Sequence, residues 1–164
     1  MKTSTLITII LAMFILGGCA FIQPYEPVEC YRGRIIEWQQ RAEREGWTIS
    51  LINDVISGCI ELSLYESEEG DHWQTYPEFA GNEMHGDCED IAVFILGTFK
   101  RLKYPHGVKV YAIRMINGDH AIIKVEVKPG VWVKYNTVPM PFDSIDMALS
   151  RPIFEFDATN YEIF

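Results

Sequence analysis

The clearest pattern along the chain is a repeat of apolar side chains between Cys88 and Leu102. Apolar residues recur there at steps of three and four, which places them in one stripe along an α-helix. Asp87 is suited to cap the N-terminus of this helix, and Asp90 stands where a capping-box partner belongs. Pro105 ends the helix. Residues 88–102 are therefore predicted to form a helix that buries one apolar face.

Helical periodicity precedes this segment, and strand-like composition follows it. Two earlier helices are predicted at 32–45 and 47–56, with Ser57-Gly58 ending the second and residues 60–65 extended. Runs of β-branched and aromatic residues predict strands at 108–116, 120–127, 131–137 and 153–156. A short helix is expected at 142–149. Helices followed by an antiparallel meander indicate the α+β class.

The N-terminus predicts an export signal. Residues 6–16 form an apolar run that is short for a membrane span and typical of a signal peptide. The run ends in Leu16-Gly17-Gly18-Cys19, which resembles the lipobox of bacterial lipoproteins, where the cysteine is lipidated and becomes the new N-terminus. We expect a signal peptide at 1–18, a lipidated Cys19 with a tether at 19–30, and one domain at 31–164. An ordinary signal peptide and a lone membrane anchor are the alternatives.

A lipidated Cys19 would also set the location. Several acyl chains on one residue hold a protein on a membrane durably, so the membrane is an expected partner. Ala20 follows the cysteine, and by resemblance to the lipoprotein sorting pattern a residue other than Asp indicates the outer membrane, facing the periplasm.

Composition and charge exclude one class of partner. The chain has 14 basic and 23 acidic residues, a formal net charge of −9. Nucleic-acid binding needs a basic face, so nucleic acid is not expected as a partner. Hydrophobic residues make up 48% of the chain, which is enough for a folded core.

Four cysteines are informative in an exported protein: Cys19, Cys30, Cys59 and Cys88. With Cys19 lipidated, three remain in an oxidising compartment, and a cysteine left over from pairing is a candidate reactive thiol. A disulfide between Cys30 and Cys59 would leave Cys88. The alternative is that both are free and buried, because sequence does not show the distance that a disulfide needs.

Cys88 stands at the start of the predicted helix. The partial positive charge at a helix N-terminus stabilises a thiolate. The unpaired N–H groups of the first turn can bind the oxyanion that forms when a thiolate attacks an acyl carbon. Cys88 is therefore the candidate nucleophile.

His120 and Asn136 are the expected base and its orienting partner. His120 lies on the more polar face of its strand, and Ala121 with every second residue after it forms the apolar face. His120 and Asn136 share a face only if the numbers of paired residues have an even sum. A three-residue loop at 128–130, with Gly130 in the left-handed conformation, gives an even sum; a two-residue turn at Pro129-Gly130 breaks the pairing unless a bulge restores its phase.

A resemblance to a known family rests on two stretches. The run Asp71-His72-Trp73-Gln74-Thr75-Tyr76-Pro77-Glu78, with His85-Gly86-Asp87-Cys88-Glu89-Asp90-Ile91-Ala92, resembles the D-x-W-x-T-P-x-E … G-D-C-E-D-x-A motifs of the bacterial transglutaminase-like cysteine proteinases. Tyr76 is an insertion between Thr and Pro. The family implies a papain-like fold, peptidase activity and a Cys-His-Asp triad. Asn136 stands where the family's Asp is expected, and papain-like enzymes have Asn in this role. Asp143 is the alternative third residue.

The acids beside Cys88 have two interpretations. Asp87, Glu89 and Asp90 raise the pKa of a neighbouring thiol by charge repulsion, and calcium would neutralise them. Some members of the resembled family bind calcium through acids that flank the cysteine, so Asp87 and Glu89 are candidate ligands. Helix capping alone explains Asp87 and Asp90 without a metal. No other cofactor is required.

The sequence thus predicts a cell-envelope cysteine peptidase that acts on a protein or peptide substrate through Cys88, His120 and Asn136. Trp73 is expected in the wall of the cleft or as an N–H donor near the oxyanion, and His85 is an alternative base. A transamidating enzyme would use the same residues. A lipoprotein that only binds an envelope partner is the non-enzymatic alternative.

Overall fold

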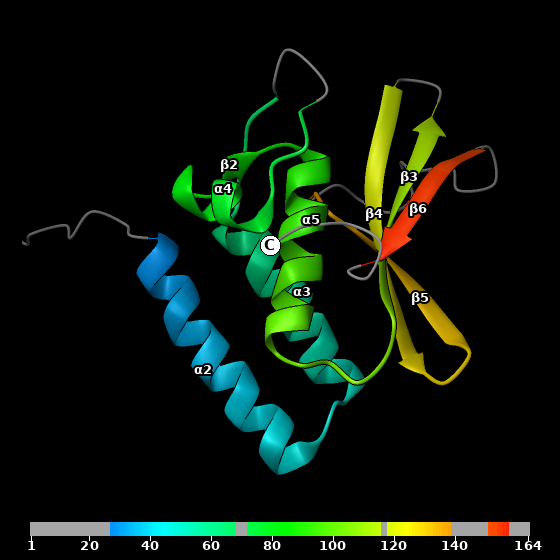
Figure 1. The fold of residues 1–164 in the computed structure, drawn as a ribbon. Coiled ribbons are helices and arrows are strands. Elements are labelled where there is room, and N and C mark those ends of the chain that lie inside the picture. The colour runs from blue at the N-terminus through cyan, green and yellow to red at the C-terminus, as the bar shows by residue number, and fades with distance from the viewer. Residues whose placement is uncertain (1–26, 68–71, 116–117, 139–150, 158–164) are drawn as a thin grey trace, which may run out of the picture.

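The fold was analysed in a computed structural model, which describes residues 27–67, 72–115, 118–138 and 151–157. It is an α+β fold in which the helices lie to one side of an antiparallel sheet (Figure 1). The fold class expected from the sequence is confirmed. The expected signal peptide, the lipidated Cys19, the helix at 142–149 and Asp143 lie outside the described residues.

The elements follow one another along the chain as predicted, with two short additions. In chain order they are α2 (Pro27–Glu45), α3 (Ile49–Leu62), β1 (Leu64–Tyr65), α4 (Tyr76–Gly81), β2 (His85–Gly86), α5 (Cys88–Arg101), β3 (Val108–Met115), β4 (Gly118–Lys128), β5 (Val131–Asn136) and β6 (Arg151–Asp157). The four-stranded sheet has the order β5-β4-β3-β6, and β1 pairs with β2 in a parallel two-stranded sheet. Helix α4 and strand β2 were not expected.

Helix α5 is the centre of the molecule. It packs on β3 and β4 of the sheet and on α3 and α4 (Figure 1). Every residue from Ile91 to Phe99 is buried, so the expectation of a single apolar stripe is wrong. A helix covered from both sides must be apolar all round, and the residues between the members of the stripe are Ala92, Val93, Leu96 and Gly97. This burial fixes the N-terminus of α5, and with it Cys88, against the sheet.

Helix α3 does not end at Ser57-Gly58 but continues to Leu62. Gly58 is buried, and a Cβ atom there would clash with the indole ring of Trp38 on α2. The glycine therefore allows α2 and α3 to approach closely and does not break the helix. Helix α2 begins at Pro27, so the last four residues of the expected tether are helical. None of the described helices is long and apolar enough to cross a membrane.

The β4–β5 hairpin keeps the expected parity by an unexpected route. Ile122 pairs with Asn136 and Lys124 with Lys134, so the even sum holds along the ladder. At the turn, however, Lys128 pairs with Val131, which leaves a two-residue turn, and a register shift between Glu126 and Lys128 restores the phase. The expected three-residue loop is thus wrong. A bulge between Glu126 and Lys128 instead brings His120 and Asn136 to the same face of the sheet. Gly130 has φ +78°, as expected.

Candidate active site

Cys88 is the first residue of α5 and is placed by its neighbour Asp87. The carboxylate of Asp87 caps the helix by accepting the N–H of Glu89, and the reciprocal bond from the Asp87 N–H to Asp90 completes a capping box. The Cys88 side chain is 8% exposed and lines a cavity of about 540 Å³, together with His120 from β4. The structure therefore brings the expected nucleophile and the expected base to one cavity.

His120 is oriented by Asn136, as the parity argument predicts. The His120 Nε2 atom lies 2.7 Å from the Asn136 Oδ1 atom, and both side chains are buried. The same oxygen accepts the Val138 N–H at 3.4 Å, which supports its assignment as the amide oxygen. Because an amide oxygen only accepts hydrogen bonds, the proton of a neutral imidazole lies on Nε2. Nδ1 is then the nitrogen that can accept a proton.

The first turn of α5 offers fewer free donors than the sequence suggests. The Asp87 carboxylate accepts the N–H groups of Glu89 and Asp90, and the Asp87 carbonyl accepts that of Ile91. Within the described residues, the Cys88 N–H is the first-turn donor for which the structure shows no acceptor. An oxyanion hole on this helix would therefore be built on the Cys88 N–H.

Burial and charge work against a thiolate at Cys88. Burial raises the pKa of the thiol to about 12; a hydrogen bond from the Ala121 N–H lowers it, and Glu89 and Asp87 raise it further. The Sγ atom lies 3.2 Å from the Glu89 carboxylate, which favours the protonated thiol. Burial also lowers the pKa of His120, although its bond to Asn136 opposes that shift. Both shifts favour the uncharged forms, a protonated thiol and a neutral imidazole.

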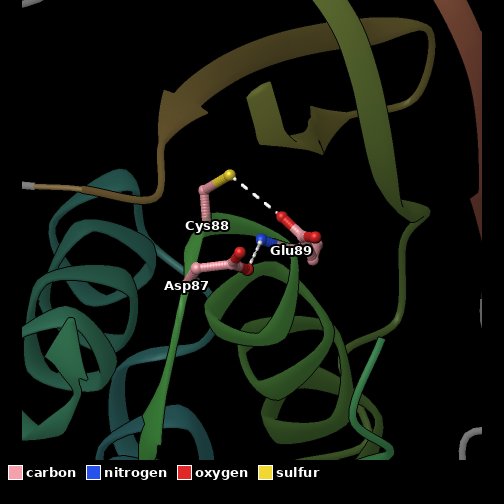
Figure 2. A group of neighbouring side chains, drawn as sticks. All are labelled: Asp87, Cys88 and Glu89. Atoms are coloured by element: carbon pink, nitrogen blue, oxygen red, sulfur yellow. Dashed lines mark hydrogen bonds between the residues drawn. The ribbon is translucent and has the colours of Figure 1, made fainter. Parts of the chain in front are cut away.

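Asp87, Cys88 and Glu89 place their ligand atoms within 4.8 Å of one another (Figure 2). Burial and the neighbouring Glu89 raise the pKa of the Asp87 carboxyl to about 7. Carboxylate oxygens are the ligands that calcium prefers, and a bound cation would relieve the repulsion between the two acids. Two of the three ligand atoms in this cluster are thus of the type that calcium prefers, and the Asp87 carboxylate also caps the helix.

A buried network holds this helix start in place, and the sequence did not predict it. Asp90 is fully buried and accepts bonds from the Gln74 backbone N–H at 2.7 Å and the Gln74 side-chain amide at 3.1 Å. The Gln74 amide also donates to the His85 carbonyl oxygen. Asp90 was expected as a cap and as one of the acids that raise the pKa of the thiol, but not as a partner of Gln74. Gln74 occupies a position between motif residues, where nothing in the sequence indicates a role.

The remaining candidates are placed as follows. Trp73 lies in the wall of the Cys88 cavity, one of the two positions expected for it. His85 bonds the Glu66 carboxylate at 3.0 Å and lines a different hollow, so it is not placed to act as the base. Cys30 is exposed, whereas Cys59 is buried and bonded to Thr98, and both are free thiols. The disulfide between them is not formed.

In this fold, a helix begins at a buried cysteine and packs on an antiparallel sheet that carries a histidine. This is the fold of transglutaminase-like cysteine proteases. The chain is similar to the transglutaminase-like cysteine protease LapG of Legionella pneumophila, with a TM-score of 0.54 and 17% identity over 76% of this chain and 84% of that one. Calcium-bound LapG matches with a TM-score of 0.51 and 20% identity over 65% and 64% of the two chains.

A third structure has the same fold. It is a Cytophaga hutchinsonii protein assigned to the cysteine proteases, with a TM-score of 0.54 and 14% identity over 79% of this chain and 45% of that one. The chain thus spans less than two thirds of the calcium-bound LapG chain and less than half of the Cytophaga protein. No family model and no curated protein sequence matches the chain.

Proposed function

We propose that the protein is a cysteine peptidase that cleaves a protein or peptide substrate with Cys88, His120 and Asn136. The observation that carries the proposal is that His120, which lines the same cavity as Cys88, is hydrogen-bonded to Asn136. The shared fold with LapG supports it, because LapG is a cysteine protease. Asn136 replaces the Asp of the resembled motif and still supplies the oxygen that orients the imidazole.

The proposed mechanism gives each of these residues a role in peptide hydrolysis. The Cys88 sulfur attacks the substrate carbonyl carbon while Nδ1 of His120 accepts the thiol proton. The Cys88 N–H stabilises the oxyanion, and His120 returns the proton to the leaving amine as the peptide C–N bond breaks. Water activated by His120 then hydrolyses the thioester and regenerates the thiol. Asn136 keeps the proton of the neutral imidazole on Nε2 throughout.

We propose further that calcium binds at Asp87 and Glu89. Structures of LapG are calcium-bound and EGTA-treated, which supports the assignment. A bound cation would supply positive charge beside the sulfur and lower the pKa of the thiol. Chelation with EGTA is therefore expected to slow alkylation of Cys88 at neutral pH, and added calcium to restore it. An alkylation rate that changes with neither EGTA nor calcium would contradict the calcium site, and Asp87 would then act only as a helix cap.

The proposed location is the cell envelope, with a lipid on Cys19 and the domain facing the periplasm from the outer membrane. The proposal rests on the Leu16-Gly17-Gly18-Cys19 run and on Ala20. Metabolic labelling with an alkyne fatty acid tests it: wild-type protein is expected to take up the label, and Cys19→Ser to lose it. Labelling that survives this substitution would contradict the proposal.

Alkylation of Cys88 tests the proposed activity itself. In the presence of calcium, iodoacetamide is expected to alkylate Cys88 faster than it alkylates the cysteine of a short peptide. His120→Ala is expected to lower the rate at Cys88 to that of the peptide. Cleavage of casein by wild-type protein, absent in Cys88→Ser, is the corresponding activity assay. Labelling no faster than a free thiol, together with no cleavage, would favour a domain that only binds a partner.

A further inference from the structure

Large apolar side chains are left exposed around the Cys88 sulfur. Tyr65, Ile153 and Phe154 are 57%, 42% and 44% exposed, and all three line the cavity that contains Cys88 and His120. Exposed apolar side chains that converge on one concave site indicate a ligand with an apolar group. The proposed catalytic roles do not use these three residues.

A bulge in β6 explains how neighbouring residues reach the same cavity. Ala112 of β3 pairs with Phe154, but the next residue, Ile113, pairs with Pro152. Ile153 is therefore the extra residue of a β-bulge. Consecutive residues of a regular strand point to opposite faces, whereas Ile153 and Phe154 both line the cavity. The bulge thus lets Ile153 line the cavity beside Phe154.

The floor of the cavity consists of two small side chains. Ala112 and Ala121 pair across β3 and β4, and both line the cavity. The next pair on the same face is Val110 and Ile123, which are larger and fully buried. Two alanines at this position leave depth beside Cys88, because larger side chains here would fill the space. Ala121 lines the same cavity as Cys88, so the floor belongs to the site that contains the reacting sulfur.

The walls of this pocket favour an uncharged group. The ring of Phe154 packs on that of Trp73, with centroids 5.3 Å apart, and gives an aromatic wall. The nearby charges of Arg114 and Asp119 satisfy each other through two bonds of 3.0 and 3.1 Å. Asp87 and Glu89, which line the same cavity, repel acidic groups. An apolar side chain satisfies all of these conditions.

We propose that the space between Ile153, Phe154 and the Ala112–Ala121 floor is a specificity pocket for a large apolar side chain next to the scissile bond of the substrate. This inference rests on the proposed peptidase function. The pocket selects among peptides by burying that side chain against Phe154 and Ile153. Ile153, Phe154 and the two alanines offer no side-chain hydrogen bond to a polar group buried against them.

Peptidyl chloromethyl ketones test the pocket without requiring hydrolysis. The probes are acetyl-Gly-Gly-Phe and acetyl-Gly-Gly-Ser chloromethyl ketones, with each second-order rate of Cys88 alkylation divided by the rate for iodoacetamide. The sulfur forms a C–S bond to the methylene carbon, chloride leaves, and His120 takes the thiol proton. Wild-type protein is expected to prefer Phe to Ser by ~10-fold or more, the range found for apolar groups in pockets.

Matched variants test whether the preference for Phe over Ser comes from the pocket residues. Ile153→Ala and Phe154→Ala are each expected to lower the Phe-to-Ser ratio by about 5-fold or more, given the area that each contributes. Ile36→Ala removes an equally exposed side chain from α2, away from the cavity, and is expected to keep the wild-type ratio. Ala112→Leu fills the floor and is expected to lower the ratio by excluding Phe. Circular dichroism and thermal unfolding confirm that each variant is folded.

Failure of the pocket and failure of the peptidase function give different results. Fast, His120-dependent alkylation with equal rates for Phe and Ser would overturn the pocket and leave the function standing. A Phe preference that survives Ile153→Ala, Phe154→Ala and Ala112→Leu would also overturn it. Slow alkylation without dependence on His120 would count against the function, and the Phe-to-Ser ratio would still decide whether the pocket exists.

Discussion

Burial and two neighbouring carboxylates oppose ionisation of the Cys88 thiol. Burial contributes most to its raised pKa, and Glu89 and Asp87 add to it. A cysteine at a helix start is favoured as a thiolate by the helix dipole, yet two carboxylates flank this one. The sequence shows this conflict, and the structure confirms that Glu89 contacts the sulfur directly.

Glu89→Gln is expected to speed alkylation of Cys88 when calcium is absent. The substitution removes the negative charge beside the sulfur and leaves a neutral amide there, so the pKa of Cys88 falls. Each unit of pKa gives tenfold more thiolate at neutral pH, and we expect an increase of about three- to tenfold in EGTA. Iodoacetamide kinetics between pH 6 and 10 measure it. Glu37→Gln, on the exposed surface of α2, is the control, and an equal increase there would contradict the explanation.

Asn136→Asp is expected to raise the pKa of His120. Burial lowers the pKa of His120 in the wild-type protein, so the acidic limb of the pH–rate profile should lie below the ordinary histidine value of 6.5. A carboxylate in place of the amide favours the imidazolium form and moves that limb to higher pH. NMR titration of the His120 ring measures the shift. An unchanged or lower pKa would show that residue 136 does not contact the ring.

At the scale of elements, the sequence predicts where regular structure begins more reliably than which faces are covered. The start of α5 follows from Asp87 and Asp90, which form the expected capping box. The burial of its whole circumference does not follow, because it depends on α3, α4 and the sheet packing around it. Gly58 was interpreted as a helix break for the same reason: its role comes from Trp38, which lies on another helix.

Gly58→Ala and Gly33→Ala form a matched test of that role. Both glycines are helical, but a Cβ atom at Gly58 meets Trp38, whereas one at Gly33 has nothing within 4 Å. Gly58→Ala is expected to destabilise the protein by about 1–3 kcal/mol through overpacking. Gly33→Ala is expected to stabilise it by about 0.5–1 kcal/mol through helix propensity. Urea unfolding measures both, and equal effects would contradict the packing explanation.

At the scale of the whole molecule, calcium should couple the active site to global stability. A ligand that binds only the folded state stabilises it by mass action, by about 2.7 kcal/mol at a concentration 100-fold above its Kd. Calcium is therefore expected to raise the melting temperature, and the double variant Asp87→Asn, Glu89→Gln to lose the response. Differential scanning fluorimetry with calcium and with EGTA measures it. A variant that responds like the wild-type protein would place the cation elsewhere.

The sequence by itself determined the local features: a capped helix that begins at Cys88, and His120 on the more polar face of its strand. Each follows from periodicity or capping within a short stretch. Tertiary structure alone decided how the cavity is shaped. The Asp90–Gln74 contact, the alanine floor and the bulge at Ile153 join segments far apart in the chain. Such contacts depend on strand register and on close packing between distant segments. They produce no periodic pattern in the sequence of any single segment, so the sequence does not predict them.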